Sequence, residues 1–157
     1  MGEPNDAARR PAPGAVALAR GVCRALDAMG YRTLTEMRLA NGRRVDVIGL
    51  DRRGRFAIVE VKATLADLRG DRKWPDYVAF CDRFYFAVPA GLALAAVPAE
   101  AGVLIADAYG ASLVRRPPTR AMAAARRRAQ TLRFARHAAA RLVRLTDPEG
   151  VVQLGLR

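Results

Sequence analysis

Lysine is nearly absent from this chain, which holds only Lys62 and Lys73 against 25 arginines in 157 residues. Arginine stays charged at any working pH and ends in a rigid fork, whereas lysine is a compact charge whose pKa can move. A position that keeps lysine in such an arginine-rich chain is therefore a candidate for chemistry that arginine cannot perform. Lys62 ends the triplet Glu60-Val61-Lys62, and this triplet is where the search for a functional site begins.

Histidine and cysteine are also scarce. His137 is the only histidine, which excludes the histidine-rich zinc sites. Cys23 and Cys81 are the only cysteines and lack a CxxC spacing. We therefore interpret them as two buried, reduced thiols, as is usual in a reducing compartment.

Long hydrophobic runs are missing as well. No run reaches the roughly 18 apolar residues that a membrane span requires, and Arg20 interrupts the early apolar stretch too soon for the core of a signal peptide. Because 52% of the residues are nevertheless hydrophobic, a disordered chain is excluded. We expect one folded domain with a substantial core, located in the cytoplasm and without a membrane partner.

The positive charge is concentrated in one segment. The net charge is +12, and residues 115–146 contain ten arginines and no acid, while the rest of the chain has 17 basic and 15 acidic residues. This distribution predicts an arm that binds a polyanion. The alternative is that an Ala/Arg-rich helix reflects a GC-rich coding bias, although such a bias does not explain the missing acids. The candidate DNA contacts on the arm are Arg126, Arg127, Arg133 and Arg136.

The hydrophobic pattern predicts an α/β fold. After a disordered lead over residues 1–13, a helix is expected from Ala15 to Met29, with one apolar stripe at helical spacing. Three strands joined by tight turns should follow, because Asn41-Gly42 is a strong hairpin signal. The expected strands of this antiparallel meander are Thr33–Leu39, Arg44–Leu50 and Arg55–Ala63. The stripe of the helix comprises Val16, Ala19, Val22, Cys23, Leu26 and Met29.

Further elements are expected after the meander. Thr64 resembles the start of a capping box with Asp67, and Pro75 suits the first position of a second helical piece. The strands expected next are Arg83–Val88, Val103–Asp107 and Ser112–Val114. A long helix should run from Thr119 to Leu145, followed by a weak strand or tail through Leu156. Residues 118–157 are expected to form a basic helix and tail on the core, through Leu132, Phe134, Leu142 and Val143.

Two acids on neighbouring strands are the candidate metal ligands. Asp46 and Glu60 each lie between β-branched residues, where an unpaired carboxylate is costly. Two carboxylates that converge repel each other, and a divalent cation removes that cost. Oxygen ligands of this kind suit Mg²⁺ or Mn²⁺. Such a metal polarises a phosphoryl oxygen and lowers the pKa of a bound water, and Lys62 can orient that water or neutralise developing charge.

A plainer interpretation also fits the spacing. Glu60 and Lys62 can form a solvent-facing pair, with Asp46 in an ion pair to an arginine. Two features favour the catalytic interpretation, namely the apolar strands that hold both acids and the rarity of lysine.

These residues resemble the PD-(D/E)xK nuclease superfamily, with Asp46 as its aspartate and Glu60-Val61-Lys62 as its E-x-K. Valine replaces the usual proline before Asp46, which removes no functional group. More narrowly, residues 35–89 resemble the MmcB-like DNA repair proteins of bacteria. The matching segments are Thr35-Glu36, Asn41–Asp46, Val59–Lys62, Asp67, Asp71-x-Lys73-Trp74, Tyr77 and Cys81–Phe86.

The resemblance implies a restriction-endonuclease-like core over residues 14–117, with a helix, a three-strand meander, a helix and a strand, extended by further strands and a C-terminal helix. It implies a metal site formed by Asp46, Glu60, the Val61 carbonyl and Glu36, with Lys62 as the catalytic lysine. The implied function is metal-dependent hydrolysis of DNA phosphodiester bonds in repair, with other repair proteins as further partners. Some members of the superfamily keep the fold without cleaving, so a DNA-binding repair module is the alternative.

Two residues after the meander are candidate DNA contacts. Lys73 and Trp74 can face DNA, and an indole can stack on an unpaired base. The alternative is that Trp74 belongs to the core and that the surrounding charges form a solvated rim. For Asp67, the sequence favours a role in helix capping and a role in the site equally.

Overall fold

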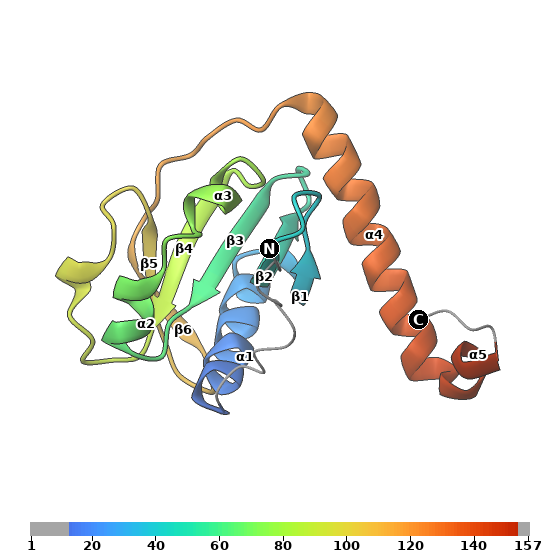
Figure 1. Ribbon diagram of the computed structural model, residues 1–157, viewed down its shortest axis with the longest axis horizontal. Helices are drawn as coiled ribbons and strands as arrows, with labels where there is room; N and C mark the ends of the chain where they lie inside the picture. Colours follow the sequence, from blue (N-terminus) through green and yellow to red (C-terminus); the bar gives the residue numbers. More distant parts are fainter. Residues whose placement is uncertain (1–12, 154–157) are drawn as a thin grey trace, which may run out of the picture.

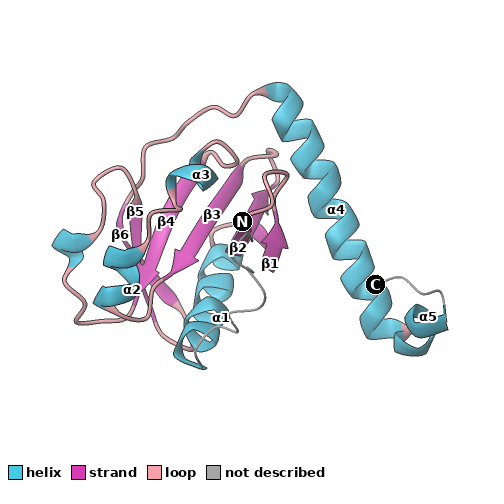
Figure 2. Cartoon of the chain, in the orientation of Figure 1, coloured by secondary structure: helices cyan, strands magenta, loops and turns pink. Residues whose placement is uncertain are grey.

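The computed structural model describes residues 13–153 as a six-stranded mixed sheet with helices on both faces (Figures 1 and 2). The predicted α/β order of helix, meander, helix and strand is confirmed. The strands are β1 (Tyr31–Arg38), β2 (Arg44–Asp51), β3 (Phe56–Val61), β4 (Arg83–Val88), β5 (Gly102–Ala106) and β6 (Ala111–Arg115). The helices are α1 (Pro13–Ala28), α2 (Leu65–Gly70), α3 (Pro75–Val78), the 3₁₀ turn η1 (Leu94–Ala96), α4 (Ala124–Thr146) and α5 (Pro148–Gln153).

The sheet keeps the strands in sequence order. The first three pair antiparallel, β4 and β5 join in parallel, and β6 closes the edge antiparallel to β5. The predicted turn after β1 is confirmed, because Gly42 has a φ of 83° and the Leu39 N–H donates to the Arg43 carbonyl at 2.8 Å. Thr64 also caps α2 as predicted, since its hydroxyl accepts from the Asp67 N–H at 3.1 Å. The turn sets where β2 begins, and the cap follows directly after the end of β3.

Helix α1 covers one face of the sheet, but its buried stripe differs from the predicted one. Leu18, Val22 and Leu26 are buried against the strands, whereas Val16 and Met29 are 46% and 39% exposed. The sequence pattern predicted that Val16 and Met29 are buried, because small residues at other positions made the centre of the apolar stripe ambiguous. The true stripe is centred on the three larger buried residues, and it leaves the smaller side chains of α1 at its margin.

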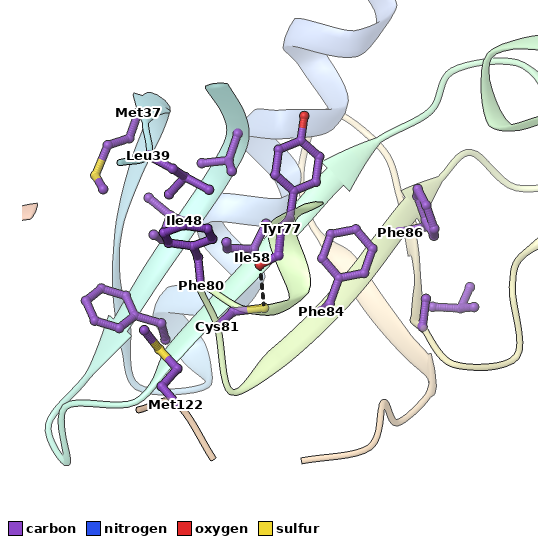
Figure 3. Packing of buried hydrophobic residues seen from close by; sticks show 14 of the residues in the cluster. Met37, Leu39, Ile48, Ile58, Tyr77, Phe80, Cys81, Phe84, Phe86 and Met122 are labelled. Carbon is purple, nitrogen blue, oxygen red and sulfur yellow. Dashed lines mark hydrogen bonds between the residues drawn. The ribbon is translucent and has the colours of Figure 1, made fainter. Parts of the chain in front are cut away.

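The opposite face of the sheet packs under α2 and α3 (Figures 1 and 3). Strand β3 alternates as predicted, since Phe56 and Ile58 belong to this cluster while Val59 and Val61 belong to the α1 side. Phe84 is central on this face, with the Tyr77 ring stacked at 6.2 Å and the Trp74 ring at 5.7 Å between centroids. Trp74 therefore packs against the core, as the alternative interpretation proposed, but its side chain is only half-buried.

The long basic helix begins later than expected. Thr119 was the predicted start, but α4 starts at Ala124, and the preceding residues run extended along the core. The Arg120 N–H donates to the Asp82 carbonyl at 2.9 Å, and Met122 is buried in the core cluster. These tertiary contacts outweigh the local helix propensity of the alanine-rich segment.

Helix α4 contacts the core through few residues, and its last turns extend past β1 (Figure 1). Phe134 packs edge-on against Phe56 with centroids 6.1 Å apart, and the Gln130 side chain donates to the Phe80 carbonyl. Three of the four residues considered for packing are instead exposed, namely Leu132 at 62%, Leu142 at 60% and Val143 at 51%.

The tail also differs from the prediction. Residues 148–153 form the short helix α5 rather than a strand, and Leu156 lies outside the described residues, as does most of the predicted lead over residues 1–13. Within residues 13–153, none of the helices has the length and apolar character needed to cross a membrane.

Candidate active site

Asp46 and Glu60 meet where the pairing between β2 and β3 ends. The last backbone pair of this ladder joins Val47 to Val59. Beyond it, the carboxylates replace the missing backbone partners, because Glu60 Oε1 accepts from the Asp46 N–H at 3.1 Å and Asp46 Oδ2 accepts from the Val61 N–H at 2.7 Å. The structure thus brings the two predicted acids together and holds each carboxylate by a backbone hydrogen bond.

Glu36 lies beside this pair in an unusual backbone conformation. Its φ of 55° makes it the only non-glycine residue with positive φ in the described part of the chain. Thr35 and Met37 still pair with β2 on either side of it, so the strain is local and costs about 1–3 kcal/mol. The carboxylate forms an ion pair with Arg44 at 2.9 Å. Such a strained acid next to two buried acids is typical of a functional site.

Burial makes ionisation of both central acids unfavourable. Burial raises the pKa of the Asp46 carboxyl, against the hydrogen bond from Val61 and the positive charge of Lys62. Burial and, after it, the charge of Asp46 raise the pKa of Glu60 well above its ordinary value. The pair therefore favours a bound cation or proton, as two neighbouring carboxylates do elsewhere.

Replacement of Glu60 by Gln should stabilise the metal-free protein at neutral and alkaline pH. A carboxyl whose folded-state pKa is raised contributes stability that is complete below its unfolded pKa, roughly 4.3 for Glu, and is lost as the pH rises through the folded value. Glutamine keeps the Oε1 acceptor for the Asp46 N–H and removes this loss. We expect thermal melts with EDTA to favour Glu60→Gln increasingly above pH 5 and to coincide with wild type near pH 4. A wild type that melts higher at every pH would contradict the raised pKa.

Lys62 follows β3 directly and is held by Asp71, through an ion pair that the sequence did not predict. Its ammonium lies 2.6 Å from Asp71 Oδ2, and the side chains of the two residues are only 15% and 5% exposed. Asp71 is itself fixed, because its Oδ1 accepts from the N–H groups of Lys73 and Trp74 at 2.7 and 3.1 Å. The lysine charge is thus held at a defined position, where it opposes the raised pKa of both Asp46 and Glu60.

Tyr77 is a second neighbour, and like Asp71 it belongs to the segments that carry the family resemblance, although the sequence did not specify its contacts. Burial raises the pKa of its hydroxyl, and the charges of Glu60 and Asp71 raise it further. Its ring lies among the core aromatics (Figure 3). The signal for both residues was their presence in these segments, but spacing alone gives no role for either one.

The donor set fits a divalent cation of the magnesium type. Within residues 13–153, no three His, Cys, Asp or Glu side chains gather into a ready metal cluster. Asp46 and Glu60 therefore offer two carboxylates, which suits Mg²⁺, since this ion usually keeps several waters and is held by one or two carboxylates together with substrate phosphates. Glu36 is engaged with Arg44, and its expected role as a ligand stays a prediction, as does that of the Val61 carbonyl.

The candidate DNA contacts fall into two groups. A groove of about 520 Å³ is lined by Trp74 from before α3, by Arg120 and by Arg126 at the start of α4, so residues distant in sequence converge there. Arg126 also lies over the Phe80 ring at 4.8 Å. The candidates Lys73, Arg133 and Arg136 lie outside this groove, and their side chains are exposed or half-exposed.

Arg127 has a different environment from the other candidate arginines. Its guanidinium forms a bidentate ion pair with Asp82 at 2.6 and 2.9 Å and donates to the Gly54 carbonyl. Asp82, 5% exposed, also accepts from the Phe56 N–H at 2.7 Å. Arg127 therefore attaches α4 to the sheet, and its side-chain donors are already engaged without DNA.

Comparisons with known proteins show what this chain is similar to. The family model described as "DNA repair protein MmcB-like" matches residues 3–149. A solved structure of a protein of unknown function from Silicibacter pomeroyi, SPO1766, is 45% identical, covers 88% of this chain and 95% of its own, and has a TM-score of 0.84. A repair endonuclease from Pyrococcus abyssi is 20% identical over 57% of this chain and 43% of its own, with a TM-score of 0.39. No curated protein matches the chain.

Proposed function

Since the chain belongs to the MmcB-like DNA repair family, we propose that it serves repair as a Mg²⁺- or Mn²⁺-dependent nuclease that hydrolyses DNA phosphodiester bonds. The observation that carries this proposal is the reciprocal hydrogen bonding of Asp46 and Glu60 where β2 and β3 separate. It holds two buried carboxylates beside the ammonium of Lys62, which is the residue set that metal-assisted hydrolysis requires.

Each side chain has a distinct task in this proposal. Asp46 and Glu60 hold the cation, which polarises a phosphoryl oxygen and lowers the pKa of a bound water. Lys62 places a positive charge where negative charge develops on the phosphate. Asp71 keeps that ammonium in position through the 2.6 Å ion pair, so that little reorganisation is needed during the reaction.

DNA is the expected partner of the basic surface. Lys73, Trp74 and Arg126 lie around or beside the groove between α3 and the start of α4, and Arg133 and Arg136 continue the positive charge along α4. Arginines of this kind bind the phosphate backbone without reading the sequence, while an indole can stack on an exposed base.

One observation favours a non-cleaving DNA-binding module as the second candidate. Lys62 is engaged with Asp71, and this ion pair offsets part of the positive charge that would stabilise the phosphate during cleavage. A nuclease assay with Mg²⁺ and Mn²⁺ on single-stranded, duplex, mismatched and branched DNA separates the two candidates. Metal-dependent product that disappears in Lys62→Ala supports the nuclease, whereas DNA binding without product on any substrate supports the module.

The metal site is tested directly by removing its acids. We expect Asp46→Ala and Glu60→Ala each to lose Mn²⁺ binding in calorimetry while keeping the fold, because each variant removes one of the two central carboxylate ligands. Glu100→Ala removes an exposed acid elsewhere and should bind Mn²⁺ like wild type. Unchanged Mn²⁺ affinity in both site variants would show that the assignment is wrong.

A further inference from the structure

A cavity of about 320 Å³ opens on the α1 side of the acids. Helix α1 contributes Ala15, Ala19, Arg20 and Cys23 to its wall, and the strands contribute Thr35, Glu36 and Asp46. Asp46 therefore belongs both to the cavity and to the acid pair. A ligand in the cavity would therefore lie next to an ion or phosphate bound at Asp46 and Glu60.

Small side chains in one row of α1 leave room for the cavity, which Arg20 also lines. Ala15, Ala19 and Cys23 follow one another at a spacing of four residues, which puts them in a row along the helix. Unfilled space of this size lowers stability relative to a well-packed core, and a larger residue at position 19 would fill part of it. A mostly apolar cavity with a few polar groups at one end is typical of a small-molecule or cofactor site.

We propose that this cavity receives an unpaired nucleobase of the DNA strand whose phosphate binds at Asp46 and Glu60. The inference rests on the proposed function, because the acids supply the position of the phosphate. The small apolar side chains suit the face of a base, and the Arg20 guanidinium on the wall can stack on a base as well. Thr35 and Glu36 supply hydrogen-bonding groups for the polar edge of the base.

The substrate class follows from the depth of the site. A base that is stacked and paired cannot enter a cavity, so a duplex must first release it, at a cost that is least for a mismatched, damaged or already unpaired nucleotide. We therefore infer that the protein acts on DNA that carries an unpaired nucleotide next to the scissile phosphate, such as a bulge, flap or single strand.

The first test measures binding to three duplexes of the same sequence in Ca²⁺. One duplex is continuous, one carries a single bulged nucleotide, and one carries an abasic residue in that bulge. Because a stacked base typically contributes a factor of ten or more to affinity, we expect the bulged nucleotide to bind about tenfold more tightly than the abasic bulge. Equal binding of these two duplexes would overturn the proposal.

The variant Ala19→Phe fills the cavity and should abolish this difference. Ala28→Phe adds the same bulk at an exposed position near the end of α1 and should keep it. Retained Mn²⁺ binding by Ala19→Phe would show that the acids remain in place. A folded Ala19→Phe variant that still prefers the bulged base would exclude the cavity as the site of binding.

Cys23 offers a measurement that needs no substitution. Cys81 is buried, and burial raises the pKa of its thiol to about 12, so it should not react with an alkylating reagent at neutral pH. We expect Cys23 to be alkylated in the free protein and protected by the bulged duplex but not by the abasic one. Equal reaction with both duplexes, or no reaction in the free protein, would overturn the proposal.

These readouts also separate this inference from the nuclease proposal. Base-dependent binding and protection without cleavage of any substrate would support the cavity and overturn the nuclease. Equal cleavage of all three duplexes by both wild type and Ala19→Phe would support the nuclease and overturn the cavity.

Discussion

Lys62→Arg and Lys62→Ala should each lower the rate of DNA cleavage by about 10²–10³-fold, as removal of one transition-state donor does in other enzymes. DNA affinity should stay within several-fold of wild type, because an interaction made mainly in the transition state affects rate rather than ground-state binding. The arginine variant is the more informative one. It keeps the charge, but its longer planar group cannot occupy the position that Lys62 holds 2.6 Å from Asp71.

The chain supplies a matched control for this prediction. Arg52→Lys makes the reverse exchange at an exposed residue in the turn between β2 and β3, outside the proposed site, and should keep full activity. Single-turnover rates and DNA affinities measured for the three variants separate chemistry from binding. Full activity in Lys62→Arg would exclude the catalytic role and leave Lys62 as the partner of Asp71 alone.

The sequence predicted the placement of the two acids well because the pattern of each strand was local and clear. The hairpin signal at Asn41-Gly42 and the apolar neighbours of Asp46 and Glu60 sufficed to place both acids on adjacent strands of a meander. Their contact depends on little else, since the separation of the strands is produced by the carboxylates themselves, which take over the backbone hydrogen bonds.

What the sequence did not predict depends on contacts between distant segments. The ion pair of Lys62 with Asp71 joins a strand to the loop after α2, and no periodicity relates them. The same holds for Asp82 and Arg127, which are 45 residues apart. The positive φ of Glu36 is equally invisible, because a glutamate gives no local signal for a left-handed backbone. Positions at which local sequence patterns fail to predict the structure are typically functional or strained ones.

Helix α4 shows how composition can indicate a surface while obscuring individual roles. Its arginines were grouped as one polyanion-binding arm, yet Arg127 is engaged by Asp82 inside the structure. Removing this guanidinium leaves a buried carboxylate unpaired, which costs up to about 3 kcal/mol. A variant that includes Arg127 would therefore confuse loss of DNA contacts with loss of the α4 attachment, and the arm must be tested without it.

The triple variant Arg126→Gln, Arg133→Gln, Arg136→Gln should weaken DNA binding equally for all sequences and flatten its salt dependence. Each phosphate contact on duplex DNA contributes about 0.9 to the slope of log affinity against log salt. If all three arginines contact phosphate, the slope should decrease by roughly 2 to 3. Fluorescence anisotropy between 50 and 200 mM salt measures this slope, and circular dichroism confirms that the variant is folded.

A second triple variant shows whether the position of the charge matters. Arg24→Gln, Arg32→Gln and Arg53→Gln remove the same charge from exposed positions on α1, on β1 and in the turn after β2, so the net charge decreases equally. Because specific phosphate contacts and not net charge set the number of counterions released, this control should keep most of the wild-type slope. Equal slopes for both triple variants would mean that α4 attracts DNA only through overall charge, and an unaltered slope in the α4 variant would exclude the arm from the DNA interface.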